Sequence, residues 1–262
     1  MVAADEHKPD MPRPVRRKSG EPRQTTRPPV AALLFAQSDR PVAGDLDGLS
    51  HASQAFAVTW HDDATGQAEL FCDGLAFDCC GLAPGAALRM DSPIQQIALP
   101  GAFVAADHAL VTIAAGSQLG GAGQLLPVVR MLVGLVAALG ALPGLRAVAW
   151  LPARLAMSPE WFAEAIGIWL KGGPFPALAL TSLVRSERGL ASCGLAYFVG
   201  QEFVFAGKDG VLCESDARGA VRLTDWLVAH GPIDAPRTVD LAGFGKVRIE
   251  PDAPGGLLAH KL

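Results

Sequence analysis

The segment Gly194-Leu195-Ala196-Tyr197-Phe198-Val199-Gly200-Gln201-Glu202 constrains the fold of this 262-residue chain more than any other. It lies between two apolar runs and contains the only tyrosine. It also places one carboxylate, that of Glu202, after a glycine in otherwise apolar surroundings. Apolar runs separated at a glycine are typical of a strand, a break in the backbone and a second strand. The segment therefore predicts a backbone shape, and it indicates no reaction.

The composition is that of a globular protein, with 50% hydrophobic and 18% charged residues. A chain of this length can bury a sizeable core. The net charge of −4 is unevenly distributed, because residues 1–29 hold seven basic and four acidic residues, a net of +3. The remaining residues therefore carry a net of −7, which disfavours binding of nucleic acid by the folded part.

Residues 1–29 contain six prolines and no apolar periodicity, so they predict a disordered, basic, proline-rich tail. A strongly apolar run, 30–36, follows at once and marks the start of the folded part. We find no linker composition beyond it. The sequence therefore predicts a single α+β domain over residues 30–262.

The compartment is indicated by the cysteines and by the apolar runs. The first residues are charged and proline-rich and lack the apolar core of a secretory signal. Five cysteines form an odd set without C-x-x-C spacing, which favours reduced thiols. The apolar run 131–142 is too short to cross a bilayer and predicts a buried core helix. We therefore expect a cytoplasmic protein without a membrane segment.

Periodicity and breaking residues predict the elements. Ser158-Pro159-Glu160 has the residue types of a helix start, with serine as N-cap and proline in the first turn. The side chains of 161, 162, 165, 166 and 169 then share one helical face. The predicted strands are 30–36, 55–61, 67–77, 93–99, 108–114, 147–151, 177–184, 190–198, 203–205, 238–241 and 246–249. The predicted helices are 45–55, 124–141, 159–171 and 220–230. This order predicts an α+β fold with a mixed, largely antiparallel sheet and helices packed on its faces.

Several of these pieces, in this order, resemble an uncharacterised bacterial family, the domain-of-unknown-function family numbered 4261. The resemblance covers about residues 30–250. Its sharpest part is Gly194-Leu195-x-x-Phe198-x-Gly200-x-Glu202, and Ser158-Pro159-Glu160-Trp161-Phe162 adds to it. It implies a compact cytoplasmic α+β domain, and it implies no established activity. It makes Gly194, Phe198, Gly200 and Glu202 a candidate motif, functional or structural.

Two places in the chain have residue types that can bind small molecules. The glycine-rich loop 116–123 precedes a helix, but its glycine spacing fits neither nucleotide fingerprint, so a flexible connection is favoured. Glu202 is the second place. It is a buried acid, or a partner for Arg185 or Arg188, that could act as an acid or base, or it is a structural carboxylate that binds loop amides or an arginine. We favour the structural role.

The other reactive residue types form no recognisable set. Cys79 and Cys80 need a nearby base to act as nucleophiles, and the sequence cannot place His51, His61 or His108 beside them. His61 with Asp62 and Asp63 lies in an expected hairpin turn, without zinc-ligand spacing. The sequence therefore predicts no catalytic residue, no metal ligand and no cofactor.

These observations favour a non-catalytic protein-interaction or accessory domain with a protein partner. The alternative is an enzyme or small-molecule-binding protein with a pocket near Glu202 and Arg185 and the sheet end at Gly116. A third alternative is a homodimer that pairs through sheet edges.

Overall fold

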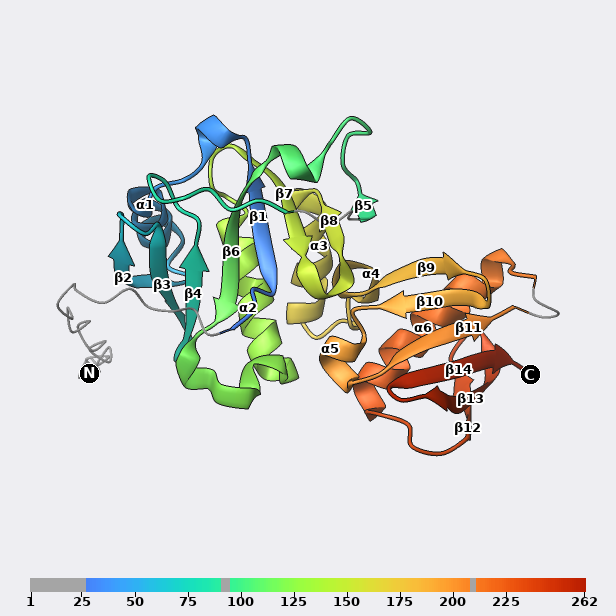
Figure 1. The fold of residues 1–262 in the computed structure, drawn as a ribbon. Coiled ribbons are helices and arrows are strands. Elements are labelled where there is room, and N and C mark those ends of the chain that lie inside the picture. The colour runs from blue at the N-terminus through green and yellow to red at the C-terminus, as the bar shows by residue number, and fades with distance from the viewer. Residues whose placement is uncertain (1–26, 91–94, 208–210) are drawn as a thin grey trace, which may run out of the picture.

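The protein has an α+β fold, as predicted, and its strands form two sheets that lie side by side (Figure 1). The computed structural model describes residues 27–90, 95–207 and 211–262. Most of the predicted tail, 1–26, lies outside the described residues. Both sheets are mixed and largely antiparallel, so the predicted fold class is confirmed.

The first sheet has eight strands in the order β2-β3-β4-β6-β1-β7-β8-β5. All neighbours are antiparallel except β5 and β8. The central strand β1 is buried on both faces, as its continuous apolar run predicts. The strands are β1 (Ala31–Phe35), β2 (Ala57–Asp62), β3 (Gln67–Cys72), β4 (Leu75–Cys80), β5 (Gln95–Ile97), β6 (Ala109–Ala115), β7 (Leu145–Trp150) and β8 (Leu155–Met157).

Alternate side chains of the central strands reach two different cores. Leu33 and Phe35 of β1 lie in the large core beneath the helices, together with Trp150 of β7. Ala32 and Leu34 lie in a smaller core on the opposite face, which loop side chains cover. This alternation follows from the period of two in a strand.

Three helices cover the large core of the first sheet. The helix α2 contributes buried valines and leucines along most of its length, as its apolar pattern predicts. The helix α3 begins where Ser158 accepts a hydrogen bond from the backbone N–H of Trp161 at 3.2 Å, which confirms the predicted N-cap. These helices are α1 (Ala43–Ser53), α2 (Leu126–Leu139) and α3 (Pro159–Leu170), with 3-10 helices η1 (Gln37–Asp39), η2 (Ala105–Asp107), η3 (Ser117–Gln124) and η4 (Leu151–Ala153) nearby.

The second sheet has six strands in the order β12-β13-β14-β11-β10-β9. Within the described part of the chain, its only parallel pair is β11 with β14, and β14 is a strand that we did not predict. The strands are β9 (Ser182–Ser186), β10 (Gly189–Cys193), β11 (Glu202–Ala206), β12 (Arg237–Leu241), β13 (Gly245–Ala253) and β14 (Gly256–Lys261). The short helices α4 (Ala177–Leu180) and α5 (Ala196–Val199) lie between the two sheets (Figure 1).

One long helix, α6 (Glu214–His230), packs on one face of the second sheet. Its buried residues Ala220, Leu223 and Leu227 meet Phe203 and Phe205 of β11 in a separate core. Each sheet therefore has its own hydrophobic core. Whether residues 30–262 behave as a single domain stays a prediction.

Three predicted strands were wrong in part. The run 67–77 is divided between β3 and β4 at Asp73 and Gly74, because both adopt positive φ, 44° and 87°, as a two-residue hairpin turn requires. The run 177–184 begins as the helix α4, where the Thr181 hydroxyl donates to the carbonyl of Ala177 at 2.7 Å. The run 190–198 ends as a strand at Cys193.

Among the described residues, no single helix is long and apolar enough to cross a membrane. The neighbouring helices η3 and α2 reach that length and composition only together, and they meet at an angle of 106°.

The N-cap of α3 gives a stability prediction. Ser158→Ala removes the acceptor for the Trp161 N–H, so we expect the free energy of unfolding to fall by about 1 kcal/mol. Ser158→Asp keeps an acceptor and is expected to stay within about 0.5 kcal/mol of the unmodified protein. Denaturant unfolding measures both variants. Equal losses for alanine and aspartate would contradict a capping role.

Candidate functional site

The candidate motif forms a tight helical turn between β10 and β11, where we predicted a strand on either side of a glycine. Gly194 turns the chain with φ +89°, and a Cβ there would lie 2.7 Å from the Cα of Ala153. Gly200 ends α5 in the left-handed conformation at φ +73°. Only glycine fits at Gly194, for two reasons. Side chains disfavour its positive φ, and a Cβ there would push η4 away.

Glu202 holds this turn closed. Its Oε1 atom accepts hydrogen bonds from the backbone N–H groups of Gly194 at 2.8 Å and of Ala196 at 3.0 Å. Its Oε2 atom accepts a short hydrogen bond from the hydroxyl of Ser192. The Ser192 oxygen in turn accepts from the N–H of Phe203 at 2.8 Å. The partly buried carboxylate therefore binds backbone amides, which is the structural role that we favoured.

Arg185 and Arg188 do not pair with Glu202 in the described structure. Arg188 binds Asp252 instead, with Nη1 2.7 Å from Oδ2. Arg185 is exposed on the edge strand β9, opposite Leu190, whereas Glu202 lies at the start of β11. The structure therefore does not bring together the two residues of the alternative pocket.

The two faces of α5 contact different cores. Val199, and Leu195 just before the helix, pack against the core of the second sheet. Tyr197 and Phe198 pack against the core of the first sheet. The motif is therefore a joint that fixes one sheet to the other.

An aromatic cluster builds the first-sheet side of this joint. Trp150 lies 5.6 Å from the ring of Tyr197 and 6.3 Å from that of Phe198, between ring centroids. Phe198 also meets Phe175 edge to face at 5.1 Å. Such ring pairs add about 0.5–1.5 kcal/mol each beyond the area they bury. Phe198 is thus placed as a packing residue.

Cys79 is buried and Cys193 is partly buried, and both thiols have surroundings that disfavour the thiolate. Burial raises the pKa of the Cys79 thiol far above its usual range, and the neighbouring Cys80 and Asp78 add to the rise. Burial also raises the pKa of Cys193, as does the charge of Glu202. A raised pKa lowers the thiolate fraction and hence the reactivity.

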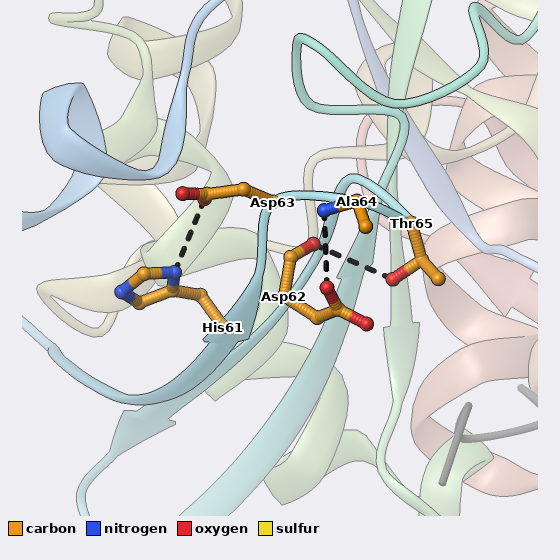
Figure 2. Close-up of polar contacts among 5 residues, drawn as sticks. All are labelled: His61, Asp62, Asp63, Ala64 and Thr65. Atoms are coloured by element: carbon orange, nitrogen blue, oxygen red, sulfur yellow. Dashed lines mark hydrogen bonds and ion pairs between the residues drawn. The ribbon is translucent and has the colours of Figure 1, made fainter. Parts of the chain in front are cut away.

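His61 contacts Asp63, whereas Asp62 accepts hydrogen bonds within its own turn from Ala64 and Thr65 (Figure 2). The Nδ1 atom of His61 lies 3.2 Å from Oδ1 of Asp63, while the carboxylate of Asp62 accepts the N–H of Ala64 at 3.0 Å. In residues 27–90, 95–207 and 211–262, no three His, Cys, Asp or Glu side chains gather as metal ligands would.

A cavity of about 560 Å³ lies at the end of the first sheet, beside the glycine-rich segment. This segment, for which we favoured a flexible connection, is the 3-10 helix η3, kinked at Gly120. Its flexibility stays a prediction. Arg27 and Tyr197 line the cavity, together with Gly121 and Gly123. The sequence pointed to the glycine-rich loop and to the sheet end at Gly116 as possible binding places, but not to Arg27, which we predicted to lie in the disordered tail.

An apolar groove of about 280 Å³ lies between α3, the segment 174–179 and α6. Its walls include Trp161, Ile168, Phe175 and Leu178, and its polar lining side chains are Arg222 and Asp225. No local pattern indicates this groove, and the strand that we predicted over 177–184 leaves no place for it.

The comparisons with known proteins returned no match to a family model, to a curated protein or to a solved structure. The resemblance to the family numbered 4261 therefore stays a prediction.

The contacts of Glu202 predict a loss of stability on substitution. Glu202→Ala leaves the N–H groups of Gly194 and Ala196 and the Ser192 hydroxyl without their acceptor, so the free energy of unfolding is expected to fall by about 2–3 kcal/mol. Glu187→Ala, in the exposed β9–β10 turn, is the control and is expected to change it by less than about 0.5 kcal/mol. Denaturant unfolding compares the two, and equal losses would contradict the closing role.

Tyr197 gives a pH prediction that absorbance can follow without interference, because it is the only tyrosine. Burial raises its pKa from 10.0 to about 12, against the lowering effect of the Arg27 charge. The folded state therefore holds the phenol proton more tightly than the unfolded state. This contribution to stability is complete below pH 10 and is lost as the pH rises towards 12.

The measurement is a titration of phenolate absorbance in native and in denaturant-unfolded protein. We expect the unfolded protein to titrate near pH 10 and the native protein about two units higher. Arg27→Gln removes the opposing charge and is expected to move the native titration further upward. A native titration near pH 10 would show that the phenol is not buried.

Proposed function

We propose that this protein is a non-catalytic protein-interaction domain, and that the apolar groove between α3 and α6 binds side chains of a partner protein. The observation that carries this proposal is the exposure of large apolar side chains at the groove. Ile168 is 53% exposed and Leu178 is 49% exposed, although both lie beside a hydrophobic core. Exposed apolar surface that gathers in one hollow is typical of an interaction site.

The size of the groove favours a protein segment over a small molecule. A volume of about 280 Å³ lies just below the range of roughly 300–1,000 Å³ typical of small-molecule pockets. It holds one or two apolar side chains, as an amphipathic helix would insert them. Arg222 and Asp225 offer one charge of each sign, so the matching segment carries apolar anchors flanked by an acidic and a basic residue.

Contacts with the joint between the two sheets hold the walls of this groove in place. Phe175 lines the groove and also contacts Phe198 of the joint, which Glu202 closes from the second sheet. The groove is thus built from both halves of the molecule, since α3 belongs to the first and α6 to the second. We place the protein in the cytoplasm and expect no nucleic-acid partner, given its five free cysteines and the net charge of −7 beyond residue 29.

The two alternatives have less support. A pocket at Glu202 and Arg185 would need side chains that the fold separates, since one binds backbone amides and the other is exposed on β9. A homodimer would use an edge strand such as β9, where Val184 is 42% exposed. Light scattering would detect such a homodimer directly, as a doubled molar mass.

The test introduces a charge into the groove. Leu178→Asp is expected to weaken partner binding by about tenfold or more, because a carboxylate would be desolvated on docking. Val104→Asp is the matched control, since Val104 is also 49% exposed and lies outside the groove. Affinity purification from the native host identifies the candidate partner, and calorimetry with that purified partner measures each variant.

We expect Val104→Asp and Glu202→Gln to retain the partner, because neither changes the groove lining. Circular dichroism checks that all variants remain folded. If Leu178→Asp binds the partner as tightly as Val104→Asp does, the groove is not the docking site. Turnover of a metabolite by the purified protein would overturn the non-catalytic proposal as a whole.

A further inference from the structure

The cavity of about 560 Å³ at the end of the first sheet has the size and lining of a small-molecule site. It lies where β6 leaves the sheet and the chain enters η3, on the side of the joint that presents Tyr197. Val30 and Ala115 give it apolar walls, and Arg27 gives it a cation. Among the residues that the structure describes, it shares none of its lining with the apolar groove, so the two are separate features of the molecule.

The charge of Arg27 is the main electrostatic feature of this cavity. Arg27 is half-buried, and no acidic side chain is among the described lining residues. Within the described part of the chain, it has no hydrogen-bonding or ion-pairing partner. A partly desolvated cation without a counter-charge is unfavourable, and a bound anion removes that penalty.

The glycines of η3 keep the cavity open next to this cation. At Gly120 and Gly121, the position that a Cβ would take has nothing within 4 Å. At Gly123, a Cβ would lie 3.1 Å from Nη1 of Arg27 and 3.0 Å from the Cβ of Ala115. A side chain at Gly123 would therefore displace the guanidinium, whereas glycine lets it lie against the backbone.

Tyr197 fixes the opposite wall. Its hydroxyl donates a hydrogen bond to the carbonyl of Gly123 at 3.1 Å, which ties η3 to the joint. The hydroxyl oxygen keeps free lone pairs, and the ring offers an aromatic face. The wall thus combines one polar atom with apolar surface.

We propose that this cavity binds a small organic monocarboxylate, with its carboxylate on the Arg27 guanidinium and an apolar body against Val30, Ala115 and the ring of Tyr197. A planar guanidinium matches a carboxylate through two parallel hydrogen bonds. The described lining supplies one cation, which balances one negative charge, so a monocarboxylate fits better than a phosphate dianion. This inference is independent of the protein-interaction proposal.

Calorimetric titration of the full-length protein tests this with three probes: naphthylacetate, phenylacetate and octanoate. Each is compared with its neutral amide, which has nearly the same shape and lacks the charge. We expect at least one carboxylate to bind about tenfold or more tightly than its amide, the difference typical of hydrogen bonds to a charged group. Absence of binding by all three carboxylates, or equal binding by carboxylate and amide, would overturn the proposal.

Two variants locate the binding. Arg27→Gln is expected to remove the preference for carboxylate over amide, while Arg218→Gln, an exposed arginine on α6, leaves it unchanged. Gly121→Val fills the open space and is expected to weaken carboxylate and amide alike. A carboxylate preference that persists in Arg27→Gln would place the anion elsewhere. The comparison of carboxylate with amide on the unmodified protein decides the proposal even if a variant fails to fold.

Discussion

The carboxylate of Glu202 is the constraint on which the arrangement of the two sheets depends. It binds the backbone N–H groups of Gly194 and Ala196, and so folds the chain between β10 and β11 into the turn of α5. That turn sends Leu195 into one core and Phe198 into the other. The ring contacts of Phe198 with Trp150 and with Phe175 are made from that turn.

Local signals were enough to predict much of the fold. The continuous apolar run of β1 implied a strand buried on both faces, and the Ser158-Pro159-Glu160 order implied the start of α3, because both depend on neighbours in sequence. The α+β class followed from the order of such elements. The turn at Asp73 and Gly74 also has a local signal, because Asp-Gly between apolar runs is typical of a hairpin. Our prediction of one strand over 67–77 did not use it.

The candidate site depended on contacts that no local pattern contains. The sequence placed Glu202 near a glycine, but it did not show that Ser192 of β10 and the N–H groups of Gly194 and Ala196 donate to its carboxylate. The strand of Glu202 also pairs in parallel with β14, some fifty residues later. The association of Arg27 with Gly123 and Tyr197 joins three distant parts of the chain. In the sequence, a basic residue beside prolines indicates a solvated tail. Only the folded structure shows that this residue lines a cavity.

The joint between the two sheets contributes residues to the walls of both the cavity and the apolar groove. Tyr197 lines the cavity with its hydroxyl on Gly123, while the neighbouring Phe198 packs with Trp150 and Phe175, and Phe175 lines the apolar groove. A ligand that binds only the folded cavity stabilises the native state by mass action. One helical turn thus supplies contacts to both the cavity and the groove, through Tyr197 on one side and through Phe198 and Phe175 on the other.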